Sequence, residues 1–133
     1  MELINALEKL IEQHLKDYLF TLHHYSIYSM DNIITVSGKR KEDDISEFNL
    51  LRLGISEEHR EFLIPNIFIP KDDRKKGIGL GLIAFIYEIA QKLNFGLALV
   101  QMTDSFRQKM LKRGALETGI YDCLEIVQST NLK

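Results

Sequence analysis

The sequence of 133 residues contains one cysteine, no tryptophan and two prolines. A single cysteine, Cys123, can form neither an intramolecular disulfide nor the thiolate cluster of a zinc site. A reducing compartment, the cytoplasm, is therefore expected. No stretch rich in proline, glycine or serine marks a linker, so we expect one domain over residues 1–133.

The chain also lacks a strong excess of either charge and a long apolar run. Seventeen Lys and Arg residues against nineteen Asp and Glu residues leave a net charge of −2. That balance disfavours a protein held to nucleic acid through phosphate contacts. No apolar run approaches the roughly 20 residues needed to cross a bilayer, and residues 1–4 have no basic targeting character. We therefore expect no nucleic-acid partner and no membrane partner.

What the sequence does contain is a succession of periodic segments in its first half. Apolar residues recur every three or four positions at the start, which predicts an amphipathic helix. Shorter runs with strand character follow, and Asp31-Asn32 is typical of a hairpin turn. The expected elements are a helix over 4–22 and strands over 25–30, 33–38, 47–55 and 61–69. The apolar stripe of the helix predicts core packing, with a homodimer surface as the alternative.

The second half predicts a βαβ unit. A strand over 63–69 is followed by a largely buried helix over 76–93 and by a continuous apolar run over 95–101. A run that is apolar on both faces is typical of a parallel strand, and the crossover should be right-handed. A shorter helix over 105–113 and a last strand over 121–127 complete the chain. The predicted fold class is α+β, with a mixed β-sheet flanked by helices.

Three alternating glycines, Gly77, Gly79 and Gly81, open the predicted second helix after a charged stretch. A helix N-terminus presents unpaired N–H groups and about half a positive charge, and glycine lets an anion approach that backbone closely. The pattern therefore favours a phosphate site; the alternative is a solvated turn whose glycines only permit tight packing. A P-loop is excluded because no Lys-Ser/Thr pair follows the glycines. Leu82 in place of the third glycine excludes the dinucleotide fingerprint.

A third phosphate motif fits better. The run Arg74-Lys75-Lys76-Gly77-Ile78-Gly79 matches Arg/Gln-x-x-Gly-x-Gly/Ala, and it resembles the acyl-coenzyme A (acyl-CoA) loop of the GNAT acetyltransferase superfamily. The resemblance extends from about Leu63 to Ala115, where residues 111–115 are similar to the family's Tyr-x-Lys-x-Gly-Phe helix end. It implies a GNAT-like fold with a central acyl-CoA-binding βαβ unit. The helix at the N-terminus is atypical for that family.

The resemblance also implies a function and a cofactor site. It implies an N-acyltransferase that moves an acetyl group from acetyl-CoA to a primary amine of a small molecule or peptide, without a metal. The two parallel strands should separate between residues 67–69 and 99–101 to admit the thioester. The residues assigned to acyl-CoA binding are Ile67, Phe68, Ile69, Arg74, Lys75, Lys76, Gly77, Ile78 and Gly79.

The catalytic groups are less clearly defined. Glu61 is a candidate base at the start of its strand, with an exposed strand-end carboxylate as the alternative interpretation. The tyrosine that often protonates the departing thiolate in the family is replaced by Met110, whose thioether cannot donate a proton. Tyr121 is the candidate substitute acid. The second hypothesis is a catalytically impaired GNAT-like module that binds acyl-CoA or a protein partner, and the third is an unrelated phosphate-binding protein.

Overall fold

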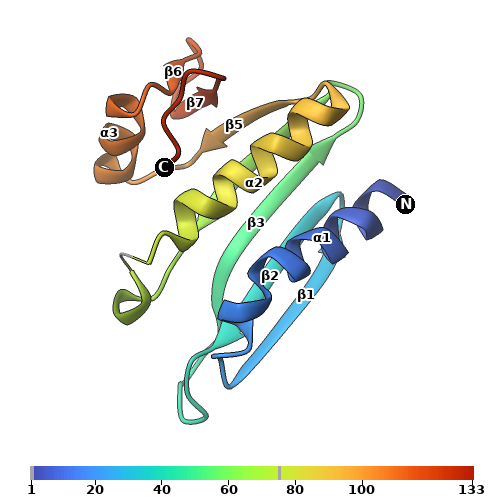
Figure 1. The fold of residues 1–133 in the computed structure, drawn as a ribbon, viewed down its shortest axis with the longest axis vertical. Coiled ribbons are helices and arrows are strands. Elements are labelled where there is room, and N and C mark those ends of the chain that lie inside the picture. Colours follow the sequence, from blue (N-terminus) through green and yellow to red (C-terminus); the bar gives the residue numbers. More distant parts are fainter. Residues whose placement is uncertain (1, 75) are drawn as a thin grey trace.

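The structure is a computed structural model that describes residues 2–74 and 76–133. Over these residues the chain forms three α-helices and one seven-stranded sheet (Figure 1). The helices are α1 (Glu2–Leu19), α2 (Ile78–Leu93) and α3 (Asp104–Lys112). The strands are β1 (His24–Met30), β2 (Ile33–Lys39), β3 (Phe48–Ser56), β4 (Glu61–Ile67), β5 (Gly96–Val100), β6 (Leu116–Glu117) and β7 (Cys123–Ile126). None of the described helices is long and apolar enough to cross a membrane.

The sheet has the strand order β1-β2-β3-β4-β5-β7-β6. Strands β1 to β4 form an antiparallel meander, whereas β4 and β5 run parallel and are connected through α2. The two last strands pair antiparallel with the β5 side of the sheet. The α+β class and the central βαβ unit predicted from the sequence are therefore confirmed.

The Asp31-Asn32 turn fixes the register of the first hairpin. Both residues have left-handed backbone torsions, with φ of 53° and 62°, as a type I′ turn requires. Met30 consequently pairs with Ile33. Because side chains alternate along a strand, this register sends Ile34 to the helix-covered face and Ile33 to the opposite face.

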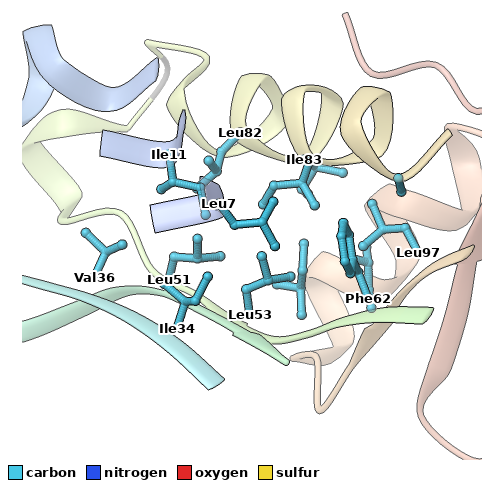
Figure 2. Close-up of a cluster of buried hydrophobic side chains, with 14 of the residues drawn as sticks. Leu7, Ile11, Ile34, Val36, Leu51, Leu53, Phe62, Leu82, Ile83 and Leu97 are labelled. Atoms are coloured by element: carbon cyan, nitrogen blue, oxygen red, sulfur yellow. The ribbon is translucent and has the colours of Figure 1, made fainter. Parts of the chain in front are cut away.

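The core lies between the sheet and two helices on one of its faces. Figure 1 shows α1 and α2 side by side in front of the strands, and Figure 2 shows Leu7 and Ile11 of α1 meeting Leu82 and Ile83 of α2. The sheet contributes Ile34, Val36, Leu51, Leu53, Phe62 and Leu97, all essentially without solvent exposure. Complete burial of one such side chain stabilises the fold by roughly 1.5–3 kcal/mol. The predicted core packing of the first helix is confirmed.

The structure differs from the predicted boundaries where local backbone chemistry intervenes. Helix α2 begins at Ile78 because Gly77 has a left-handed φ of 77°. Helix α3 begins earlier than predicted, because the Thr103 hydroxyl accepts a hydrogen bond from the Phe106 N–H at 3.3 Å and caps it. The two-residue strand β6 was not predicted, since so short a segment carries no periodic pattern.

Candidate functional site

Strands β4 and β5 separate part-way along their length. Their parallel pairing ends at Ile64 and Leu99, although β4 continues beside β3 as far as Ile67. Pro65 follows the last pair and has no N–H to donate to a neighbouring strand. On the other side, Gln101 has a φ of 54°, which turns the chain after β5. The two strands thus diverge and leave a gap between them.

The gap has a volume of about 180 Å³ and is lined mainly by apolar side chains and backbone. The Phe68 N–H donates to the Leu50 carbonyl at 2.9 Å, on the β3 side. Successive N–H groups of an extended chain point to opposite edges, so the Ile67 N–H group points towards the gap. The lining residues are Ile64, Pro65, Asn66, Ile67, Phe68, Leu99, Val100, Gln101, Met102, Thr103 and Phe106.

The N-terminus of α2 lies against the free stretch of β4. A Cβ atom on Gly79 would lie 3.8 Å from Ile67 Cγ2 and 3.9 Å from Ile69 Cγ1. The first bond of the helix runs from the Gly81 N–H to the Gly77 carbonyl at 2.9 Å. The N–H groups of residues 78–80 therefore precede the helical hydrogen-bond ladder. The free N–H groups of the helix end therefore lie close to the segment that contains Ile67 and Ile69.

Two of the glycines border open space. A Cβ atom on Gly77 or on Gly81 would meet no other atom within 4 Å. The left-handed torsion accounts for glycine at position 77, but Gly81 lies inside a helix, where glycine costs about 0.5–1 kcal/mol relative to alanine. Close packing within the described chain therefore does not explain Gly81. A helix end with this open surface fits an anion such as a pyrophosphate.

A buried carboxylate holds the charged loop in place. Asp73, 5% exposed, accepts hydrogen bonds from the Tyr18 hydroxyl at 2.7 Å and from Arg40 Nε at 2.9 Å, and Lys76 Nζ lies 3.4 Å away. Burial alone would raise the Asp73 pKa. The hydrogen bonds from Tyr18 and Arg40 outweigh burial and hold that pKa below its ordinary value. Burial and the bond to Asp73 also raise the Tyr18 pKa well above its usual range.

The basic residues of the motif differ in their surroundings. Arg74 Nε donates to the Ile69 carbonyl at 2.9 Å, and its guanidinium carbon lies 5.7 Å from the centre of the Phe68 ring. Its positive charge therefore lies beside the gap. Lys76 is exposed next to Asp73. The predicted contact residue Lys75 lies outside the described residues.

The candidate catalytic residues do not line the gap. Glu61 pairs with Gly96 at the opposite end of the β4–β5 ladder. Tyr121 is 96% exposed and lines a neighbouring hollow that shares Met102 with the gap. Met110 is fully buried in the core. Of the predicted cofactor residues, the structure places Gly79 next to Ile67 and Ile69, and Arg74 next to Phe68 and Ile69, but neither the candidate base nor the candidate acid joins them.

Several residues important to this site were not identified from the sequence. Pro65 could have been identified, because a proline inside a predicted strand indicates a position where no neighbouring strand accepts a backbone hydrogen bond. Asp73 carried none, since its partners Tyr18 and Arg40 are remote in the chain. Phe106 lines the gap where the family motif had directed attention to Met110. Among the described residues, no three His, Cys, Asp or Glu side chains are grouped to hold a metal ion.

Comparisons with protein-family models, with curated proteins and with solved structures found no match to this chain.

Proposed function

We propose that this protein is a GNAT-type N-acyltransferase that moves an acetyl group from acetyl-CoA to a primary amine. One observation carries the proposal. The N-terminus of α2 lies against the part of the chain that follows the last β4–β5 pair. A Cβ atom added to Gly79 would lie within 4 Å of Ile67 and Ile69. A helix end suited to an anion therefore lies next to Ile67, a residue that lines the gap, which suits a ligand with a pyrophosphate followed by an amide-containing arm.

The proposed ligand would follow this surface in order. Its pyrophosphate would lie on the N–H groups from Gly77 to Gly79, with Arg74 adding positive charge. Its amide-containing arm would run along the end of β4, where the Ile67 N–H group points to the gap. The thioester would then lie between β4 and β5, near Pro65 and Val100.

Acyl transfer at this position needs few protein groups. The neutral amine attacks the thioester carbonyl carbon, a C–N bond forms and the C–S bond breaks. The proton lost from nitrogen ends on the released thiol sulfur. Backbone N–H groups at the gap would stabilise the carbonyl oxygen as negative charge develops there. Since no Asp, Glu, His, Lys, Cys or Tyr side chain lines the gap in the described chain, water would carry the protons and transfer should be slow.

The same lining supports a second candidate function. A module that binds acyl-CoA without efficient transfer needs the helix end and the gap but no acid or base. The absence of such side chains among the described gap-lining residues favours this alternative over a fast enzyme. The two candidates share the binding site and differ only in turnover.

Thermal unfolding with and without coenzyme A tests the binding site that the two candidate functions share. At one hundred times the dissociation constant, a ligand of the folded state adds about 2.7 kcal/mol to its stability. The midpoint should then rise by several degrees. If millimolar coenzyme A and acetyl-CoA both leave the midpoint unchanged and calorimetry detects no heat of binding, both candidates are wrong. Release of free thiol from acetyl-CoA with a panel of amines then separates the enzyme from the binding module.

A further inference from the structure

The face of the sheet turned away from α1 and α2 carries an apolar row that crosses five strands. The register places Met30 opposite Ile33, Ile33 opposite Gly54, Gly54 opposite Leu63, and Leu63 opposite Ala98. Met30 is 67% and Ile33 39% exposed, and Leu63 is half-buried. Since Gly54 has no side chain, the row is hollow between Ile33 and Leu63.

This hollow is part of a groove of about 490 Å³. On this face its apolar lining includes Ile33, Gly54, Leu63, Pro65 and Val100, and the groove also includes Ile4 of α1 and Ile55. Pro65 and Val100 also line the gap between β4 and β5. The groove therefore leads along the sheet face directly into the gap.

The far end of the groove is acidic. Asp31 of the hairpin turn and Glu57 and Glu58 of the β3–β4 turn line it, and no Lys, Arg or His is among its described lining residues. None of the ion pairs between described residues involves these three carboxylates. Their negative charge is thus not neutralised within the described fold and complements a cation.

A positive charge lies near the gap end of this face, outside the described lining of the groove and of the gap. Arg52 is on the same face and pairs with Asn66, a residue that lines the gap. A positive charge there disfavours an ammonium ion and favours the neutral, nucleophilic amine. A ligand with two amines would therefore place its charged amine at the acidic end and its reactive amine at the gap.

We propose that the groove is the acceptor subsite and that the acceptor is a linear amine with an apolar chain and a second, distal cationic group. The proposal rests on the proposed acyltransferase function. The stretch of β4 from residue 61 to residue 65 spans about 13 Å. The contact between the distal ammonium and a carboxylate takes up about 3 Å of that length, which leaves about 10 Å between the two nitrogen atoms. An extended chain of eight methylenes between two amines spans about 11 Å. The probe is therefore 1,8-diaminooctane, with octylamine as the matched compound that lacks the second cation.

The kinetic test compares these two amines by thiol release from acetyl-CoA. We expect kcat/KM to be about three to ten times higher for 1,8-diaminooctane, because exposed ion pairs contribute modestly. The preference should appear in KM, since the distal cation is remote from the reacting atoms. It should disappear in Glu57→Gln/Glu58→Gln. It should persist in Glu42→Gln/Asp43→Asn, which removes the same charge from the exposed turn between β2 and β3. Equal kcat/KM for the two amines in the parent overturns the proposal.

A binding test without acetyl-CoA separates this proposal from the proposed function. Gly54→Val should fill the groove, since an added Cβ makes only ordinary contacts of 3.7 and 3.8 Å with Leu63 and valine suits a strand. Calorimetric binding of 1,8-diaminooctane should fall at least tenfold in a folded Gly54→Val variant, while coenzyme A binding should be unchanged. Unaltered diamine binding in that variant and in Glu57→Gln/Glu58→Gln overturns the acceptor subsite. If the parent protein does not bind coenzyme A, the proposed function is contradicted instead.

Discussion

The Tyr18 hydroxyl donates a 2.7 Å hydrogen bond to Asp73 Oδ2, and the two residues are 55 positions apart in the chain. Tyr18 belongs to α1, and Asp73 to the short 3₁₀ turn that precedes the glycines. Arg40, just after β2, binds the same carboxylate. The loop that leads into the candidate anion site is thus fastened to two elements of the N-terminal half.

Replacing Asp73 by asparagine should destabilise the fold. The change removes charge-assisted hydrogen bonds from Tyr18 and Arg40 and leaves their polar atoms poorly satisfied. We expect a loss of about 2–3 kcal/mol in the free energy of unfolding, measured by urea denaturation at neutral pH. Asp72→Asn is the matched control, because its exposed carboxylate meets Arg40 at 3.3 Å and should contribute under about 1 kcal/mol. Equal effects of the two substitutions would contradict the anchoring role of Asp73.

The lowered Asp73 pKa also gives a pH dependence with a definite sign. The stabilisation is fully present above the pKa of an unfolded aspartate, about 3.9. It is lost as the pH falls through the lower pKa of the folded state, since the unfolded chain binds the proton first. Urea denaturation between pH 5 and pH 2 should therefore show a steeper loss of stability for the parent than for Asp73→Asn. Parallel profiles would show that Asp73 does not titrate with an altered pKa.

Gly79→Glu should abolish coenzyme A binding without unfolding the protein. The new side chain would begin within van der Waals contact of Ile67 and Ile69 and bring a carboxylate to the proposed pyrophosphate position. Gly79→Gln has nearly the same shape without the charge and should bind more weakly than the parent but better than Gly79→Glu. Isothermal calorimetry measures both. Parent-like affinity in both folded variants would place the ligand elsewhere.

The two glycines that border open space should respond oppositely to alanine. Gly77→Ala forces a side chain into a left-handed torsion and should cost about 1–2 kcal/mol of stability. Gly81→Ala removes a helical glycine without creating a contact and should gain about 0.5–1 kcal/mol. If position 81 lies beneath a bound ligand, its alanine variant should also bind coenzyme A less tightly. Thermal unfolding with and without coenzyme A measures both effects. A destabilised Gly81→Ala would indicate an internal packing role.

A phenol placed in the gap should accelerate thiol release. Phe106→Tyr adds a hydroxyl to a residue that lines the gap, where it could protonate the departing thiolate. We expect about a tenfold gain or more in turnover with acetyl-CoA and an amine, at nearly unchanged coenzyme A affinity. Met110→Tyr is the contrasting variant: because Met110 is fully buried, it should cost about 1–3 kcal/mol through overpacking and give no gain in rate. A gain in rate from Met110→Tyr instead would contradict the placement of the two side chains.

The elements with strong local signals were predictable from the sequence. Apolar positions at helical spacing identified α1 and α2, and the Asp31-Asn32 pair identified the hairpin, because these patterns reflect contacts close in the chain. The apolar run of β5 identified a parallel strand because both of its faces are buried. The glycine loop was recognised for the same reason: the torsion of Gly77 and the helix start are local properties.

The parts that depend on distant contacts were not predictable. The Asp73 cluster joins residues 18, 40 and 73, which are remote in the chain. No local sequence pattern predicts that this carboxylate is buried. The motif spacing predicted that position 110 would lie at the thioester. In the structure, the orientation of α3 buries Met110 and turns Phe106 towards the gap. The groove arises only when Ile33, Gly54 and Leu63 from three strands align in register.

The parallel pairing of β4 with β5 has a kinetic consequence. The antiparallel meander from β1 to β4 closes through short turns, whereas Glu61 can pair with Gly96 only after α2 has crossed the sheet. Loop-closure entropy delays such non-local pairing, so the meander should form early and β5 should dock late. The gap exists only once β5 is docked. Partial opening of the molecule would therefore dismantle the candidate site first, and amide hydrogen exchange should be faster in β5 than in β2 and β3.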